Sequence, residues 1–408
     1  MDPSPEDWNK VRRYASWMHQ VRVEEWTFLG KETFDKLRIN SPSGGWFPAL
    51  QDLSWCLTET NLPYIDLFFS SCLKSFSFHQ ELSWGNVSLP NVRPILASAL
   101  LALPTSGLER ISGQIGHPRG YFKDSFSSVV LRCGPSFTEY DSPIPLSDAA
   151  LNHLIQLPHL HTLTVYDPPP DYSTTSLPLV FPPLKKLTLG DNAARGWLSL
   201  LRRLEDGTPS TQGRTRLFKA KESLKVLDIG YNPDITIESS FVSPIQSFRN
   251  LVHLNIDAYC HSGVEGRCIF KLNNDNVAEL AMALTQIESL VLGHACFEDA
   301  CSTTVACLLS ISVHCTKLKN LEIHFNTTNI VDDFENILED SLLQQLRSLP
   351  RCSLTRLDVY QMPLSLDEHG FEIVLKGMRD IFPSLERCNG FETDWDELSR
   401  RFVSCREE

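Results

Sequence analysis

The residues with the greatest capacity for chemistry are cysteines and histidines that gather between positions 294 and 315. Thiolate and imidazole groups are the ligands that zinc prefers. The chain has no C-x-x-C pair, however, and Cys307 falls on the apolar side of a predicted helix, where cysteine acts as a small hydrophobic side chain. We therefore predict structural cysteines, with no metal and no cofactor. The group consists of His294, Cys296, Cys301, Cys307, His314 and Cys315.

Motifs that would support catalysis are missing from the sequence. A phosphate-binding G-x-x-x-x-G-K-[ST] loop, a G-x-G-x-x-G turn, a G-x-S-x-G elbow and an H-E-x-x-H helix do not occur. A hydrolase or metal enzyme would need the cysteine and histidine group, or acids from separate strands, to converge. We predict that the chain is not an enzyme.

The elements that position all of these residues follow from one repeated pattern. Residues 224–236 read LKVLDIGYNPDIT, in which Leu224, Leu227 and Ile229 have the L-x-x-L-x-L spacing of a leucine-rich repeat. Because a five-residue strand cannot bury its apolar face alone, such units must recur and stack. Clear copies begin at Leu50, Leu73, Leu160, Leu184, Leu251, Ile287, Leu318 and Leu354, and weaker ones at Met18, Leu108, Val129 and Leu385.

The spacing of the copies indicates what lies between the strands. From Leu224 onward the starts are 27, 36, 31 and 36 residues apart, which leaves room for a helix in each repeat. Apolar residues at helical spacing fill these intervals, as in Val277, Leu280, Ala281 and Leu284. We predict an α/β leucine-rich-repeat solenoid, a horseshoe with parallel strands on the concave face and helices on the convex face.

The domain organisation follows from the same pattern. We expect a single leucine-rich-repeat domain over 1–408, with an N-terminal capping layer at 1–26 and a C-terminal cap at 385–408. The proline-rich 167–183 and the polar 205–222 are predicted surface loops. The repeat pattern is weakest between 104 and 145. Ser147 is a predicted N-cap, and Asn192, Asn232 and Asn326 are predicted to bond the backbone of their turns.

Composition limits the partners and the compartment. The 408 residues carry a formal net charge of −13, which does not fit a general nucleic-acid or membrane-surface binder. No run of 18 apolar residues and no signal-like opening is present. The 12 cysteines are therefore expected to be reduced thiols, and the chain a monomer in the cytoplasm or nucleus.

The candidate site is the set of side chains that strand alternation places on the concave face. If the residues of the L-x-x-L-x-L pattern point into the core, those between and after them point outward. Acids, hydrogen-bonding groups and tyrosines then form a surface suited to a protein or peptide that carries basic residues. The predicted partner-binding residues are Tyr166, Asp228, His253, Asn255, Asp257, Glu322, His324, Arg356, Asp358 and Tyr360.

Several stretches resemble the leucine-rich-repeat region of fungal F-box proteins of the basidiomycete type. They are P-E-D-W at 5–8, F-P-A-L-Q-D-L-S-W at 47–55, P-Y-I-D-L-F-F at 63–69 and L-P-H-L-H-T-L-T-V at 157–165. The resemblance implies that the repeats recognise a substrate for a cullin-RING ubiquitin ligase, whose adaptor would be a second partner. The F-box itself, an L-P-x-E opening followed by three helices, is not recognisable. The alternative is a stand-alone scaffold or small-GTPase regulator without a ubiquitin link.

Overall fold

The computed structural model divides the chain into two units, which we describe one at a time. The first contains Met1–Pro168 and Leu179–Leu184, and the second contains Pro169–Pro178 and Lys185–Glu408. None of the described helices has the length and hydrophobicity needed to span a bilayer. The structure describes residues 4–24, 30–42, 45–58, 61–79, 89–114, 122–166, 183–190, 201, 221–230, 237–257, 270–293, 302–339, 351–359, 364–390 and 393–404.

The strands of the first unit are parallel and follow one another in sequence order. One apolar residue from each strand lies in the same register, so that Leu53, Phe76, Ile111 and Tyr140 form a continuous buried row. This row is the core that a single repeat could not form alone. The strands are β1 (Gln20–Val23), β2 (Asp52–Cys56), β3 (Ser75–His79), β4 (Arg110–Gln114), β5 (Glu139–Asp141) and β6 (Thr162–Tyr166).

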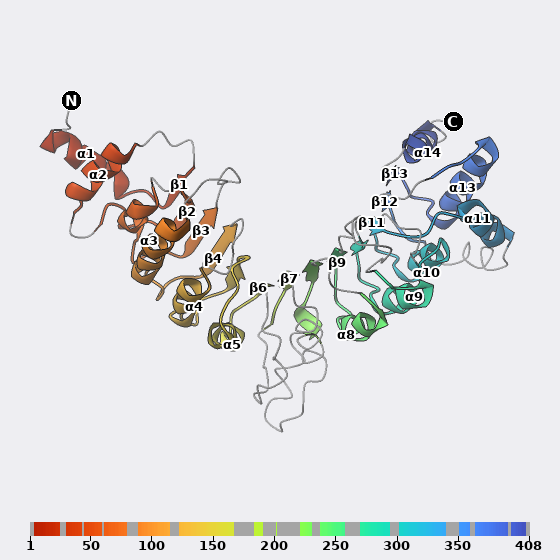
Figure 1. Cartoon of the computed structure of the whole chain (residues 1–408), viewed down its shortest axis with the longest axis horizontal. Helices are drawn as coiled ribbons and strands as arrows, with labels where there is room; N and C mark the ends of the chain where they lie inside the picture. The colour runs from red at the N-terminus through yellow and green to blue at the C-terminus, as the bar shows by residue number, and fades with distance from the viewer. Residues whose placement is uncertain are drawn as a thin grey trace, which may run out of the picture. The chain divides into compact units, whose positions relative to one another are not determined.

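The helices of the first unit lie beside its strands and cover one face of the sheet (Figure 1). Aromatic side chains fill the space between the layers: the Phe34 ring stacks on Tyr64 at 5.1 Å, and Trp55 meets Phe68 edge-on at 4.9 Å. The helices are α1 (Pro5–Ala15), α2 (Lys31–Ile39), the 3-10 helix η1 (Leu62–Phe68), α3 (Leu89–Ala102), α4 (Lys123–Leu131) and α5 (Asp148–Gln156).

The second unit repeats this arrangement. Its strands are also parallel and consecutive, and Leu187, Leu227, Leu254, Leu290 and Leu321 form one buried row. The strands are β7 (Lys186–Gly190), β8 (Val226–Gly230), β9 (His253–Asp257), β10 (Ser289–Leu292), β11 (Asn320–Ile323), β12 (Arg356–Val359) and β13 (Arg387–Gly390).

Polar caps start two of the described helices of the second unit. Asn273 accepts a hydrogen bond from the Asn276 amide at 2.9 Å, and Asp367 accepts one from the Gly370 amide at 2.7 Å. The helices lie on one side of the strands (Figure 1). They are the 3-10 helix η3 (Ser239–Phe241), α8 (Val242–Gln246), α9 (Asn274–Ala283), α10 (Ala306–His314), α11 (Ile330–Glu339), α13 (Glu368–Ile381) and α14 (Thr393–Ser404).

The predicted fold class is confirmed: parallel strands alternate with helices in an α/β leucine-rich-repeat solenoid. The predicted N-cap is also confirmed, because the Ser147 hydroxyl accepts from the Ala150 amide at 3.3 Å. The single domain over 1–408 and the capping roles of 1–26 and 385–408 stay predictions. The predicted loop 167–183 lies outside the described residues except at its last residue, as does 205–222 except at its last two.

One weak repeat was assigned to the wrong element. Val129 and Leu131 belong to α4 rather than to a strand, and the strand of that repeat is β5, about ten residues later. Phe137 and Tyr140, both buried, occupy the core positions there. The error has a simple cause: aromatic residues stand where the pattern requires leucines, so the strand was not visible as a repeat.

Candidate functional site

The sheet face of the second unit, opposite its helices, carries the predicted site in two rows. Strand register, not sequence distance, defines each row. The first row contains Lys186, Val226, His253, Ser289, Asn320, Arg356 and Arg387. The second row lies two residues further along each strand and contains Thr188, Asp228, Asn255, Val291, Glu322, Asp358 and Asn389. Every charged residue in the first row is basic or histidine, whereas every charged residue in the second is acidic.

Asp228 is held from both sides of its strand. The His253 ring nitrogen Nε2 lies 3.1 Å from Asp228 Oδ1, and the Thr188 hydroxyl donates to Asp228 Oδ2 at 3.5 Å. The aspartate is the central group, so this arrangement differs from a catalytic triad, in which histidine bridges the acid and the nucleophile. The three side chains fix one another and leave Asp228 with little freedom.

Asp358 is the most enclosed acid of the site. Arg356 Nε contacts its Oδ2 at 2.7 Å, and Asn389 Nδ2 donates to its Oδ1 at 2.7 Å. Strand alternation predicted an exposed side chain, and this is wrong, because the residue is only 7 % exposed. Because both carboxylate oxygens already have partners, Asp358 is a structural acid that orients Arg356 and Asn389 at the surface.

Three further polar residues of the face, Asn255, Asp257 and Glu322, are half-buried. Asn255 lies between Asp228 and Val291 in register, and its Oδ1 is buried without a hydrogen-bond partner among the described residues. Glu322 follows on β11, and Asp257 ends β9. These polar side chains lie at the centre of the sheet face.

Three of the predicted site residues fall elsewhere. His324 was expected to be exposed, and this is wrong: it follows the end of β11 and is 0 % exposed. Its backbone amide donates to Leu292 O at 3.2 Å, which continues the hydrogen bonding between β10 and β11. Tyr166 is half-buried at the end of β6 in the first unit, and Tyr360 lies outside the described residues.

Asparagines stabilise the turns of the repeats. The Asn326 side chain accepts from the Thr328 amide at 2.8 Å, so its predicted role is confirmed, whereas Asn192 and Asn232 lie outside the described residues. Sequence reasoning missed Asn61, which is 6 % exposed and bonds Trp55 Nε1, the Thr58 amide and Cys56 O. An asparagine soon after a repeat strand was the available signal.

The cysteine and histidine group does not form a metal site in the part that can be described. Cys307 and Cys315 are buried, and burial, with Cys352 nearby, raises the pKa of Cys315 to about 12. Among the described residues, no three His, Cys, Asp or Glu side chains are placed to share a metal ion. His294, Cys296 and Cys301 lie outside that part.

Comparisons with known proteins add little to these observations. No family model and no curated protein matches the chain. A solved structure of a leucine-rich-repeat protein from Leptospira interrogans aligns with 96% of this chain and 100% of its own, at 12% identity and a TM-score of 0.30. That score is too low to carry an argument. The strand register and the buried leucine rows therefore decide the architecture, and the chain has the fold of a leucine-rich-repeat solenoid.

Proposed function

We propose that this chain is a non-catalytic protein-binding module that holds its partner on the sheet face of the second unit. One observation carries the proposal: two rows of polar side chains in continuous register occupy a sheet face that no described helix covers (Figure 1). Stacked repeats form extended surfaces of this kind, which repeat proteins use for binding.

The contacts within the rows support binding rather than mere solvation. His253 and Arg356 each contact an acid of the second row, so their positions are set before a partner arrives. Ordering a long side chain on binding costs about 0.5–1.5 kcal/mol. Side chains that are already fixed avoid part of that cost, which favours a specific protein partner.

The dimensions of the face set a requirement on the partner. Six spacings of about 4.8 Å separate β7 from β13, and five residues of strand span about 16 Å, so the face measures roughly 470 Å². A stable interface covers about 800 Å² of each protein. The partner must therefore contact residues beyond these strands.

Charge reversal at half-buried acids tests this proposal. We expect Asp257→Lys together with Glu322→Lys to reduce recovery of partners by the tagged protein, and a cooperative thermal unfolding transition checks that the variant is folded. Glu279→Lys together with Glu372→Lys is the matched control, because both residues are exposed on helices of the same unit. Equal recovery of partners by the wild type, the Asp257 and Glu322 variant and the control would exclude the sheet face as the binding site. Asp358 is left unchanged because its substitution would disturb Arg356 and Asn389.

A finer proposal is that the bound partner is a substrate of a cullin-RING ubiquitin ligase. It is supported by the resemblance of stretches such as 47–55 and 157–165 to fungal F-box proteins. Affinity purification from the native cells, followed by mass spectrometry, tests it. Recovery of adaptor and cullin subunits would support the ligase link. Recovery of other proteins without them would favour the stand-alone scaffold.

A further inference from the structure

Basic residues collect at the amino-terminal edge of the strands in the second unit. We define the basic edge as the first residue of each strand from β7 to β13 and the residue before it. These positions hold six Lys or Arg and two Glu, a local balance of 6 − 2 = +4 in a chain of net charge −13. The basic residues are Lys185, Lys186, Lys225, Lys319, Arg356 and Arg387, and the acids are Glu288 and Glu386.

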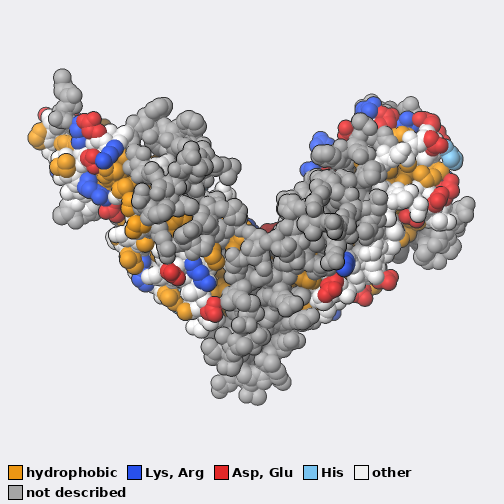
Figure 2. Space-filling view, viewed as in Figure 1, with side chains coloured by type: hydrophobic (Ala, Val, Ile, Leu, Met, Phe, Trp, Pro, Cys, Tyr) orange, Lys and Arg blue, Asp and Glu red, His pale blue; other side chains and the backbone are white. Residues whose placement is uncertain are grey.

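The repeat fold does not require this charge. The same positions in the first unit hold Lys74 and Arg110 against Asp52, Glu109 and Glu139, a balance of 2 − 3 = −1. There the charges pair, since Lys74 contacts Glu109 at 3.3 Å and Arg110 contacts Asp52 at 3.1 Å. Figure 2 likewise shows side chains of both signs on each unit. The excess is thus specific to the second unit's edge.

Part of the positive charge is compensated within the unit. Lys319 contacts Glu288 at 2.7 Å, and Arg356 contacts Asp358 at 2.7 Å. Lys185, Lys225 and Arg387 are exposed and form no ion pair with another described residue. Lys185 and Lys225 lie at the β7 end of the edge and Arg387 at the β13 end, so the uncompensated charge is found at the two ends, with the paired Lys319 and Arg356 between them.

Two of the uncompensated charges face one another on neighbouring strands. Lys186 pairs with Val226 in register, which places Lys185 opposite Lys225. Like charges opposite one another in a sheet are destabilising. A carboxylate bound between them would remove that repulsion, which gives an anionic group a site without any rearrangement of the backbone.

We propose that the basic edge binds an acidic segment of the partner protein through its Asp and Glu side chains. The proposal rests on the protein-binding function of the adjoining sheet face and names the chemistry of what binds there. The edge spans about 29 Å, the length of about nine extended residues. Asp228 and Asp358, which favoured a basic partner in the sequence, are both engaged by first-row residues.

A nucleic acid fits this surface less well than an acidic peptide does. Nucleic-acid affinity comes largely from basic residues that neutralise the phosphates of the backbone. The second row, with Asp228 and Glu322, lies only two residues, about 7 Å, from the first and would repel a phosphate backbone. A peptide can place neutral residues over these acids and carboxylates over the edge.

The test measures binding of a fluorescein-labelled peptide of ten residues, alternating Glu and Ser, by fluorescence anisotropy. We expect Lys185→Glu, Lys225→Glu and Arg387→Glu together to weaken binding at least tenfold, about 1.4 kcal/mol. Lys31→Glu, Lys271→Glu and Lys376→Glu are the matched control, because all three residues are exposed and none belongs to the basic edge. Both variants change the net charge from −13 to −13 − 6 = −19. The control is expected to bind within about twofold of the wild type.

Three results would overturn the proposal: no peptide binding by the wild type, equal losses in both variants, or tighter binding of a 20-nucleotide single-stranded DNA that the edge substitutions abolish. Failure here is distinguishable from failure of the proposed function. If the Asp257 and Glu322 variant loses its partners while the edge variant keeps its partners and still binds the peptide, only the acidic-segment proposal is wrong. If the edge substitutions abolish peptide binding while the Asp257 and Glu322 substitutions leave partner recovery unchanged, only the assignment of the sheet face is wrong.

Discussion

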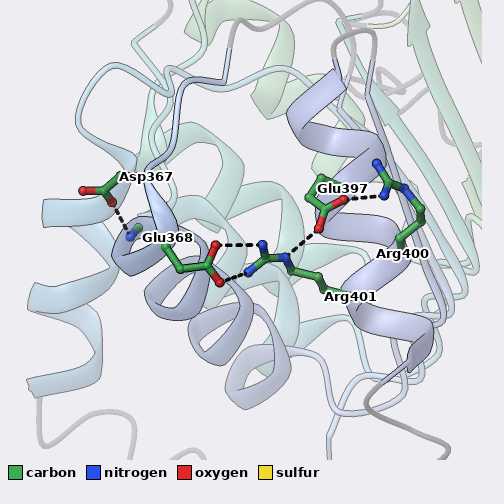
Figure 3. Close-up of polar contacts among 6 residues, drawn as sticks. Asp367, Glu368, Glu397, Arg400 and Arg401 are labelled. Atoms are coloured by element: carbon green, nitrogen blue, oxygen red, sulfur yellow. Dashed lines mark hydrogen bonds and ion pairs between the residues drawn. The ribbon is translucent and has the colours of Figure 1, made fainter.

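Arg401 of α14 holds Glu368 of α13 through two parallel hydrogen bonds (Figure 3). Its Nη1 donates to Glu368 Oε1 at 2.7 Å, and its Nη2 donates to Oε2 at 2.9 Å. Arg401 Nε also donates to Glu397 Oε1 at 2.8 Å, and the guanidinium lies 4.7 Å from the centre of the Phe371 ring. This one side chain joins the last helix of the described chain to the helix before it.

The first prediction concerns the pH dependence of that contact. The hydrogen bond from Arg401 lowers the pKa of Glu368 below its ordinary value of 4.5 and lowers that of Glu397 too. A lowered pKa in the folded state gives stability that is present above pH 4.5 and is lost as the pH falls through the folded-state pKa. Arg401→Met should therefore be less stable than the wild type in urea at pH 7, and the difference should shrink near pH 3.5.

Arg400→Met is the control for this experiment. Arg400 contacts Glu397 at 2.6 Å but is largely exposed and has no contact with Glu368 in the described structure. Exposed ion pairs contribute little. A stability difference for Arg401→Met that is the same at both pH values would show that the ring contact with Phe371, rather than the ion pair, holds α14.

The second prediction concerns the close approach of Gly390 to Trp395. A Cβ at Gly390 would lie 2.2 Å from Trp395 Cγ, and Trp395 is fully buried. Gly390→Ala should therefore displace α14 and reduce the free energy of unfolding by about 1–3 kcal/mol. Chemical denaturation followed by tryptophan fluorescence measures the loss. Gly230→Ala, where a Cβ meets nothing within 4 Å, should change it by less than about 0.5 kcal/mol.

The third prediction compares two asparagines in turns. Asn61→Ala would leave the buried Trp55 Nε1 and Cys56 O without partners, at about 1–3 kcal/mol for each group. Asn326→Ala exposes the Thr328 amide to water instead and should cost about 1 kcal/mol. Urea denaturation of both variants measures the difference. Similar losses would mean that water reaches the Asn61 site.

The fourth prediction concerns the buried thiols. Burial raises the pKa of Cys133 and Cys315 to about 12 and that of Cys352 to about 11. A raised folded-state pKa gives stability that is complete below the unfolded pKa, near 9, and is lost as the pH rises toward the folded value. Each thiol should therefore lower the free energy of unfolding by about 1.4 kcal/mol per pH unit above pH 9.

Denaturation of the wild type and of Cys133→Ala between pH 8 and about pH 10.5 tests this slope. The variant is less stable at pH 8 because it leaves a cavity, but it should lose stability less steeply as the pH rises. Iodoacetamide provides an independent readout: the exposed Cys72 should react in the folded protein at pH 8, and Cys133 only after unfolding. Parallel pH curves, or rapid labelling of Cys133, would contradict the prediction.

Much of the fold was determined by the sequence, because its signals are local. Side chains along a helix or strand point in directions fixed by the backbone, so Val277 and Leu280 could be assigned to one buried face, and Leu227 and Ile229 to the core. Ser147 was recognisable as a cap for the same reason. The sequence pattern did not predict β5, because Phe137 and Tyr140 occupy the buried positions that leucines occupy in the other repeats, and the pattern searches for leucine.

The candidate site was determined only in part. Alternation along each strand placed Asp228, Asn255 and Glu322 on one face, which the register confirms. Alternation did not predict His324, which lies one residue beyond β11 and is fully buried.

Only the tertiary structure decided which charges meet. His253 lies 25 positions from Asp228 in sequence but on the neighbouring strand, 3.1 Å away, and Arg356 neutralises Asp358 within its own strand. The basic edge likewise exists only because the strands start side by side. The periodicity of a single strand fixes which face a side chain points to, whereas the register between strands, set by the packing of whole repeats, fixes its neighbours and therefore its charge environment.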